Sequence, residues 1–157
     1  MPAPDAYDGS MDDEDIAIRN ATYQAFVKLG RAPSAVEVAT VTDAPEVAVR
    51  VAWSRLHDAH ALVLDPQTGE IRMASPFSAV PTPFRVEADG RSWYANCAWD
   101  AFGIGGALDV DSRFETACPD CDEPIHITVR DGRPDDEAPV FHVLVPAADW
   151  WTDIGFT

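Results

Sequence analysis

The segment from Trp93 to Gly106 constrains the fold more than any other part of the chain. An aromatic run typical of a β-strand leads to Cys97, Asp100 follows three residues later, and glycines close the segment. The pattern predicts that a strand ends and a helix starts at Cys97, with the helix reaching about Leu108. In such a helix Cys97 and Asp100 lie one turn apart on the same face.

This placement has a chemical consequence for Cys97. The N-terminus of a helix stabilises negative charge, so we expect the pKa of Cys97 to be depressed and its thiolate to be more abundant at neutral pH. A thiolate binds soft metals, and a neighbouring carboxyl group can move a proton. The alternative from the local sequence is a buried, inert cysteine beside an aspartate that only caps or decorates the helix.

The residues around this junction, Trp93-Tyr94 and Cys97-Ala98-Trp99-Asp100, resemble the first catalytic block of the organomercurial (alkylmercury) lyases. The resemblance implies that Cys97 and Asp100 are catalytic residues. It extends over most of the chain, through the helical N-terminal part, Pro76-Phe77-Ser78, Pro81-Thr82-Pro83, Cys118 and Trp150-Trp151.

The resemblance also implies a reaction, the protonolysis of a carbon–mercury bond. In the family, two cysteine thiolates hold mercury and an aspartate delivers the proton to the departing carbon, which releases a hydrocarbon and Hg(II). Soft sulfur binds soft mercury, and a carboxyl group supplies the acid. The family implies no required cofactor, an organomercurial as substrate, and a thiol carrier or mercuric reductase that receives Hg(II) in mercury resistance.

The sequence departs from the family pattern at its C-terminal end. In the family, a second catalytic cysteine follows a segment that resembles Trp150 to Thr157, and here the sequence stops at Thr157. The last strands and helix of the family's catalytic lobe are missing as well, so we expect that lobe to be incomplete. Either Cys118 or Cys121 supplies the second thiolate, or the chain as given is a weak lyase or none.

Cys118 and Cys121 form a Cys-x-x-Cys motif between two predicted strands. Zinc sites usually pair two such motifs, and this chain has only one. Cys97 and His126 would bring the number of zinc ligands to four, but nothing in their spacing requires this. Three interpretations stay open: structural cysteines, soft-metal binding by these thiolates together with Cys97, or redox chemistry. The family adds that a cysteine at the place of Cys118 is structural and that Cys121 lies outside the usual pattern.

The charge of the chain limits its partners. The formal net charge is -16, and an acidic surface repels nucleic-acid phosphates, so we expect no nucleic-acid partner. No apolar run approaches the roughly 20 residues that cross a bilayer, and the acidic N-terminus has no signal-peptide pattern. Three cysteines in such a chain favour reduced thiols, so we expect a soluble, cytoplasmic protein with no membrane partner.

The hydropathy pattern predicts an α+β fold in two lobes. Residues 1–11 form a disordered acidic leader, 12–74 a winged-helix-like lobe of three helices and a hairpin, and 75–83 a proline-rich, extended linker. The family resemblance implies that residues 84–157 form the catalytic-type lobe, incomplete at its C-terminus, with a mixed or antiparallel sheet of the alkylmercury lyase type.

The first two helices have recognisable start and stop signals. The first begins at Asp12 or Asp13, with an acidic first turn matched to the helix dipole, and ends at Gly30. The segment from Ser34 to Glu37 fits a capping box, which opens the second helix.

The third helix opens at 43–46 in the same manner, and we expect Val47, Val51 and Leu56 to supply its buried side. A hairpin with its turn at 65–69 follows. Three helices and a hairpin are the pattern of a winged helix, which suggests DNA binding. The helix that would enter the groove has few basic residues, so we favour a scaffold used for packing.

In the second lobe we expect strands at 84–87, 92–95, 113–117, 125–129 and 140–145, with a solvated acidic loop at 130–139. His126 and His142 fall in these strands, and either one could face the site or serve as a core or surface histidine. Trp150 and Trp151 either line an apolar pocket or close the core.

Two functions other than a lyase remain open. One is a thiol-based soft-metal-binding protein without lyase activity, which the missing second cysteine favours. The other is a winged-helix, metal-responsive regulator, which the acidic charge disfavours. The sequence therefore leaves open whether the chain is an active carbon–mercury lyase.

Overall fold

The computed structural model describes residues 11–136, 138–140 and 142–155. The chain divides into two compact units, Met1–Pro81 and Thr82–Thr157. The predicted disordered leader lies outside the described residues except for Met11. The boundaries of the predicted lobes and linker remain predictions.

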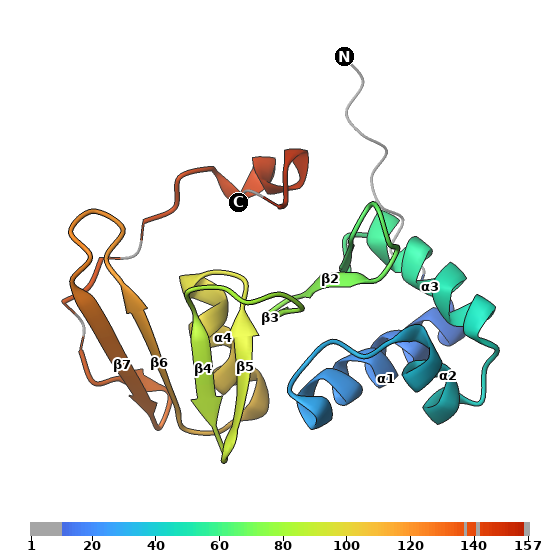
Figure 1. Cartoon of the computed structure of the whole chain (residues 1–157), viewed down its shortest axis with the longest axis horizontal. Helices are drawn as coiled ribbons and strands as arrows, with labels where there is room; N and C mark the ends of the chain where they lie inside the picture. The colour runs from blue at the N-terminus through green and yellow to red at the C-terminus, as the bar shows by residue number, and fades with distance from the viewer. Residues whose placement is uncertain (1–10, 137, 141, 156–157) are drawn as a thin grey trace. The chain divides into compact units, whose positions relative to one another are not determined.

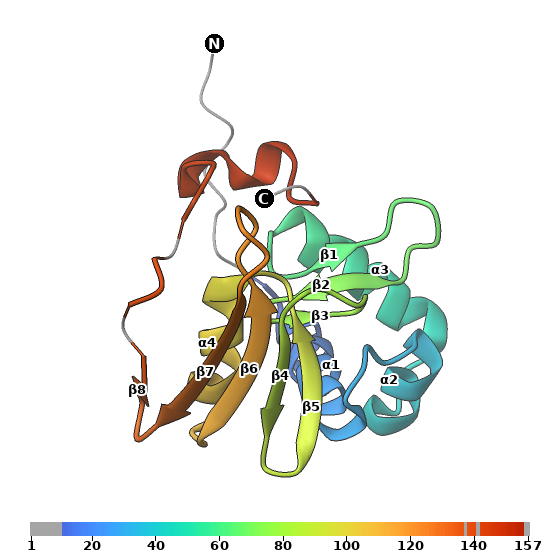
Figure 2. The same ribbon diagram turned by 60° about the vertical axis from the view of Figure 1, so that its left-hand side comes forward.

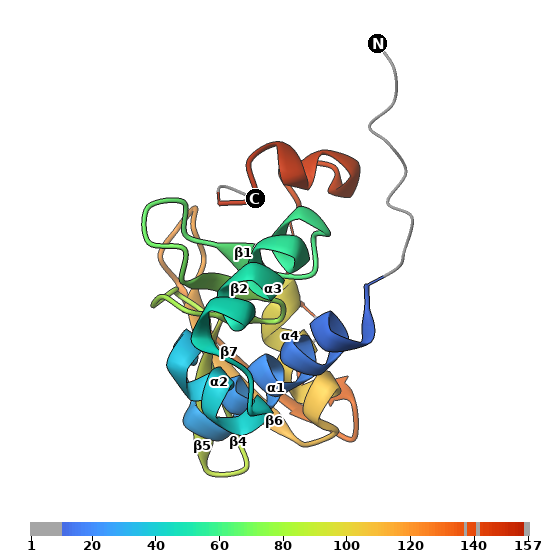
Figure 3. The same ribbon diagram turned by 90° about the vertical axis from the view of Figure 1, so that its right-hand side faces the viewer.

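The first unit begins with three helices, α1 (Asp13–Leu29), α2 (Ala35–Thr42) and α3 (Glu46–Asp58), which Figures 1 and 3 show. The side chain of Asp12 caps α1 by accepting a 2.7 Å hydrogen bond from the backbone N–H of Asp15. Gly30 ends this helix in the left-handed conformation, at φ 69°. Ser34 and Glu37 form the predicted capping box at the start of α2.

The start and the buried face of α3 differ from the prediction. Pro45 is the residue before the helix and gives no side-chain cap, whereas Asp43 ends α2 in the left-handed conformation. Val47 and Val51 are 68% and 49% exposed. Positions three and four residues apart share a helix face, so a face that includes Leu56 excludes these two valines. The buried side chains of α3 belong to Val49, Ala52, Trp53 and Leu56.

Trp53 joins α1 and α3 in the core of this unit. Its indole Nε1 donates a 3.0 Å hydrogen bond to Thr22 Oγ1, and that hydroxyl donates a 2.8 Å bond to the carbonyl of Ile18. Arg55 forms an ion pair with the buried carboxylate of Asp15. Because buried polar groups need partners, these contacts fix how the two helices pack.

Three short antiparallel strands complete the first unit: β1 (Val63–Leu64), β2 (Ile71–Ala74) and β3 (Phe77–Ser78). The predicted hairpin between β1 and β2 is confirmed, and Asp65 stabilises its turn by accepting from the amides of Gln67 and Thr68 at 2.9 Å. Strand β3 lies inside the segment 75–83 that was expected to be a linker. The winged-helix arrangement of this unit stays a prediction.

The second unit is an antiparallel sheet with one helix against it (Figure 2). The order of its strands is β5-β4-β6-β7-β8, and helix α4 contacts β4, β5 and β6. Its elements are β4 (Arg85–Ala88), β5 (Arg91–Ala95), α4 (Ala98–Leu108), β6 (Ser112–Ala117), β7 (Pro124–Arg130), β8 (Arg133–Pro134) and the 3-10 helix η1 (Ala147–Thr152).

Alternation along the strands gives this sheet an apolar face and a charged face. Val86, Phe114 and Ile127 are in register on adjacent strands and are buried. On the other face Glu87 pairs with Arg85 and Arg113. The period of two in a strand accounts for this division and places the core on the side of the sheet that α4 covers.

The C-terminal part of the second unit differs from the prediction. The expected strand at 140–145 is wrong for the residues that can be described, Val140 and 142–145, which are not in a strand. Val140 and Leu144 are 87% and 79% exposed, so these two apolar side chains do not belong to the core of a sheet. Strand β8 lies within the expected loop at 130–139 and pairs with β7.

The described helices and strands confirm the predicted α+β class, and the strand pairs are antiparallel. Within residues 11–136, 138–140 and 142–155, no helix has the length and apolar composition that a membrane span requires.

Candidate functional site

Cys97 lies where the sequence predicts it, between the end of β5 and the first residue of α4. The backbone N–H of Ala95 donates a 2.9 Å bond to the carbonyl of Phe84, and Thr82 Oγ1 donates a 2.6 Å bond to the carbonyl of Ala95. These bonds fix the end of β5. The carbonyl of Cys97 then accepts from the N–H of Ala101 at 3.0 Å, which starts the helix. The thiol is therefore held on rigid backbone.

Asp100 lies in the first turn of α4, and it is half-buried. Its Oδ2 accepts a 2.8 Å hydrogen bond from Nδ2 of Asn96. Burial raises the pKa of Asp100 above its ordinary value, and the hydrogen bond from Asn96 opposes this shift. A carboxyl group with a raised pKa keeps its proton to higher pH, as a general acid requires.

The predicted depression of the Cys97 pKa is wrong. Burial raises the pKa of the Cys97 thiol above its ordinary value, against the effect of the Asp100 amide. The Asp100 carboxylate adds to the rise, and the amide of Trp99 acts against it. Burial and the adjacent carboxylate therefore disfavour the thiolate more strongly than the helix N-terminus favours it.

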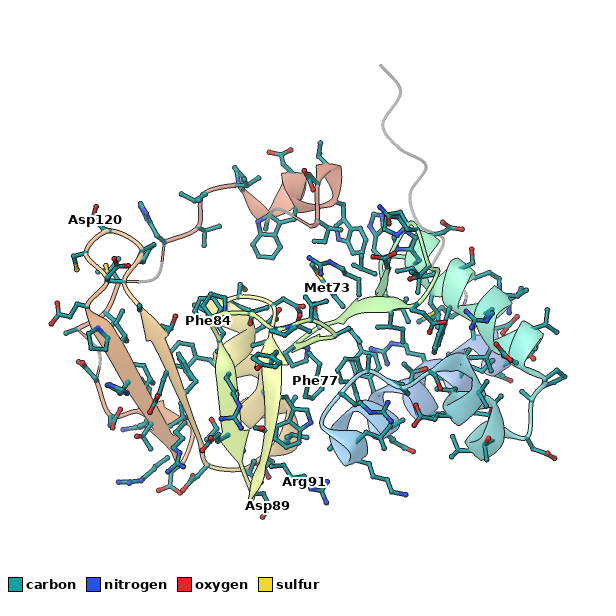
Figure 4. All side chains as sticks on the ribbon, viewed as in Figure 1. Met73, Phe77, Phe84, Asp89, Arg91 and Asp120 are labelled. Atoms are coloured by element: carbon teal, nitrogen blue, oxygen red, sulfur yellow. The ribbon has the colours of Figure 1, made fainter. Side chains whose placement is uncertain are left out.

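Cys97 lies in the wall of an apolar cavity of about 310 Å³. Phe102 of α4 and Phe114 of β6 meet edge to face there, with ring centroids 5.0 Å apart. Trp150 closes another part of the wall and donates a 2.7 Å hydrogen bond from Nε1 to the carbonyl of Val145. Other lining residues are Phe84, which Figure 4 labels, Ile125, Ile127, His142, Val143 and Leu144.

The cavity decides between several alternatives that the sequence left open. Trp150 lines a pocket, as one interpretation of the Trp150-Trp151 pair expected. Of the two histidines, His142 lines the cavity, whereas His126 lies exposed on β7 with Nδ1 3.3 Å from Glu115 Oε1. The Asp100 carboxylate belongs to the same helix turn but is not part of the cavity wall.

Cys118 and Cys121 occupy the turn between β6 and β7, and both are free thiols. Hydrogen bonds to the Cys118 sulfur from the amides of Asp120 and Cys121, and from the Cys121 side chain, lower the pKa of Cys118. Neither cysteine lines the cavity, although their neighbours Ala117 and Pro119 do.

The proposed zinc site finds no support in this arrangement. Among the residues that the structure describes, no three His, Cys, Asp or Glu side chains come together in a way that could hold a metal ion. Cys97, Cys118 and Cys121 therefore do not converge as one ligand set, and His126 does not complete a four-ligand site with them.

Sequence reasoning missed Asn96 and most of the cavity wall. Asn96 belongs to no motif, and its contact with Asp100 needs the backbone to turn between β5 and α4. The sequence gives no reason to single out Phe102, Phe114 or Ile127 as site residues. Their periodicity could have placed them on the α4 side of the sheet, but it carries no signal that a cavity is left between them.

Comparison with known proteins agrees with the predicted family. The family model for alkylmercury lyase matches residues 77–157. Among solved structures, the crystal structure of the mercury-bound form of MerB2 is similar, with a TM-score of 0.66 and 22% sequence identity. The match covers 83% of this chain and 62% of that chain, so this chain spans under two thirds of that structure.

None of the curated proteins matches the chain. The structural likeness to mercury-bound MerB2, at 22% identity, shows a shared fold. The family match spans more than half of the sequence and contains Cys97, Asp100 and the cavity beside them. The protein belongs to the alkylmercury lyase family.

Proposed function

We propose that this protein is an organomercurial lyase-like protein that cleaves a carbon–mercury bond by protonolysis. The thiolate of Cys97 binds the mercury of the substrate, and Asp100 gives the proton to the departing carbon. The observation that carries the proposal is Cys97 in the wall of an apolar cavity, with a half-buried carboxyl group in the first turn of the helix that begins there.

The cavity supports an organic group as part of the substrate. Its volume of about 310 Å³ is at the lower end of ligand pockets, and its wall consists mainly of aromatic and aliphatic side chains. An organomercurial has an apolar carbon group and a soft metal, which match the apolar wall and the Cys97 sulfur. Phe102 and Phe114 are placed to contact the carbon group.

The proton transfer follows from the environment of Asp100. The Cys97 sulfur forms a bond to mercury, and its proton leaves with the ligand that mercury carried. The carbon–mercury bond then breaks, and its electron pair takes the proton of the Asp100 carboxyl group. A small thiolate takes the open position, so Hg(II) remains bound to two sulfur atoms. The raised pKa of Asp100 keeps this proton available at higher pH, and solvent reprotonates the carboxylate afterwards.

The cavity wall supplies mercury with the Cys97 thiolate but with neither of the other two cysteines. Cys118 and Cys121 do not line the cavity with Cys97, and the pKa of Cys97 is raised. Both observations favour a second candidate function, a thiol-based soft-metal-binding protein with little or no turnover. In either role Hg(II) would pass to a thiol carrier or a mercuric reductase, as part of mercury resistance.

The test is release of benzene from phenylmercury in the presence of excess small thiol. The proposal expects turnover by the full chain, no turnover by Cys97→Ser, and a loss of about 10²- to 10⁴-fold in Asp100→Asn, since an amide cannot supply the proton. Mercury binding by Asp100→Asn stays intact. Asp109→Asn, at the other end of α4, is the matched control and keeps full activity.

The outcomes separate the two candidates. Mercury capture by Cys97 without benzene release in the full chain identifies the binding protein. Equal loss of binding and turnover in Asp100→Asn contradicts the role of Asp100 as proton donor. Turnover that is unchanged in Cys97→Ser contradicts the lyase mechanism as a whole.

A further inference from the structure

The turn between β6 and β7 places two free thiols three residues apart. Its backbone is closed by two hydrogen bonds of 2.9 Å, from the N–H of Asp122 to the carbonyl of Cys118 and from the N–H of Cys118 to the carbonyl of Glu123. Figure 4 shows Asp120 on this turn, beyond the ends of the two strands. Cys118 is half-buried and Cys121 is exposed, so the pair is accessible from solvent.

The spacing of the two cysteines suits a shared metal ion. Cys118 and Cys121 lie three residues apart on a turn that is closed by the hydrogen bond from Asp122 to Cys118. This is the ligand spacing of Cys-x-x-Cys metal sites, in which both sulfur atoms bind one ion.

We propose that Cys118 and Cys121 form a two-thiolate site for Hg(II), separate from Cys97. The described residues supply no third His, Cys, Asp or Glu close enough to complete a larger ligand set. Zinc requires four ligands in a structural site, whereas Hg(II) is satisfied by two soft thiolates in a linear arrangement. The carboxylates of Asp120, Asp122 and Glu123 surround the turn and favour the approach of a cation.

The turn that carries Cys118 and Cys121 lies beside the cavity that contains Cys97. Ala117 and Pro119, on either side of Cys118, line the same cavity as Cys97. Hg(II) leaving Cys97 through that cavity therefore meets the pair at its edge. This transfer depends on the proposed function, but Hg(II) binding by the pair does not.

The transfer is a ligand exchange with no change of oxidation state. Hg(II) held by Cys97 and a small thiol loses both of its mercury–sulfur bonds. Two new mercury–sulfur bonds form, to Cys118 and to Cys121. The protons that these two thiols give up pass to the Cys97 sulfur and to the small thiol.

The test uses mercuric chloride and the full chain, reduced and under anaerobic conditions, with a small monothiol as competitor. The Cys97→Ser variant should retain one Hg(II) per chain after dialysis and show ultraviolet sulfur-to-mercury charge-transfer absorption. Removing Cys118 or Cys121 from that variant should weaken retention by about tenfold or more, because two thiolates on one turn act at an effective concentration of millimolar order. Asp109→Asn at the C-terminal end of α4 is the control, since it removes a carboxylate that does not belong to the turn.

The proposal is overturned if Cys97→Ser retains no Hg(II), or if its retention is unaffected by the loss of either cysteine. Equal or tighter retention of zinc at the pair would overturn the two-ligand assignment. Cys121 is exposed, so Cys121→Ser decides the question even if Cys118→Ser unfolds. Mercuric chloride has no carbon–mercury bond, so failure of the lyase proposal leaves this result unchanged.

Discussion

Asn96 and Asp100, on either side of Cys97 in the sequence, are joined by a hydrogen bond of 2.8 Å from Asn96 Nδ2 to Asp100 Oδ2. The other end of the amide, Oδ1 of Asn96, is buried and has no hydrogen-bond partner among the described residues. A side-chain amide can donate to a carboxylate through its nitrogen or accept from a carboxylic acid through its oxygen. Asn96 thus has a group suited to each protonation state of Asp100.

The first prediction concerns the pKa of Asp100 in Asn96→Ala. The hydrogen bond from Asn96 lowers this pKa while burial raises it, so removing the bond should raise the pKa of Asp100 further. A general acid loses activity as the pH rises through its pKa. The alkaline limb of any phenylmercury turnover should therefore move to higher pH.

The carboxyl carbon of Asp100, followed by NMR during a pH titration, measures this shift without requiring activity. The matched control is Asn20→Ala on the exposed surface of α1, where the Asp100 titration should not change. A downward shift in Asn96→Ala would contradict the assigned role of the hydrogen bond.

The second prediction concerns the reactivity of Cys97. Its pKa is raised by burial and by the Asp100 carboxylate, so alkylation should still accelerate with pH above the ordinary thiol range. Asp100→Asn removes the negative charge but keeps the backbone amide. The pKa of Cys97 should then fall, and alkylation at neutral pH should become faster.

The measurement is the rate of iodoacetamide labelling against pH in a chain whose Cys118 and Cys121 are replaced by serine. Asp109→Asn in the same background controls for a charge change at the far end of α4. If the pKa of Cys97 lies below the ordinary thiol value while Asp100 is present, this prediction is wrong. The pKa would then be depressed, as the position at the helix N-terminus suggests.

The third prediction concerns Gly105 in α4, which carries the site. A Cβ at this position would lie too close to Oγ of Ser112 and 3.0 Å from Cβ of Ser112, so either Ser112 or the helix must shift. Gly105→Ala should destabilise the chain by about 1–3 kcal/mol, the usual effect of overpacking. Gly106 has no neighbouring atom within 4 Å, so Gly106→Ala should stabilise it by about 0.5–1 kcal/mol.

Urea unfolding of the full chain measures both effects. Oγ of Ser112 is buried without a hydrogen-bond partner among the described residues, so Ser112→Ala should restore part of the stability lost in Gly105→Ala. Equal effects of alanine at positions 105 and 106 would show that contact with β6 does not limit the position of α4.

The fourth prediction concerns the core of the first unit. Thr22→Val removes the hydroxyl that accepts from the buried indole of Trp53. An unsatisfied buried N–H costs about 1–3 kcal/mol, and urea unfolding should show a loss of that size. Thr40→Val is the matched control, because its exposed hydroxyl donates only to the carbonyl of Val36, and its effect should stay within about 0.5 kcal/mol.

Local sequence signals determined much of the backbone. The capping box at Ser34, the glycine end of α1 and the turn at Asp65 are confirmed because each depends on hydrogen bonds between residues close in sequence. The same holds for the junction at Cys97, where an alternating strand pattern changes to a helix. The family was identified separately, from the resemblance of Trp93-Tyr94 and Cys97-Ala98-Trp99-Asp100 to the alkylmercury lyases, and the family match agrees with it.

Tertiary structure decided what depends on burial and on distant contacts. The packing of α3 against α1 and α2 decided which valines are buried, and the local sequence pattern predicted the wrong ones. The pKa of Cys97 is raised chiefly because the fold buries its thiol away from water, and no local pattern encodes that burial. Cys97, Phe114 and Trp150 are far apart in the sequence, and no local pattern connects them. They line one cavity because the sheet and the C-terminal segment bring their side chains together.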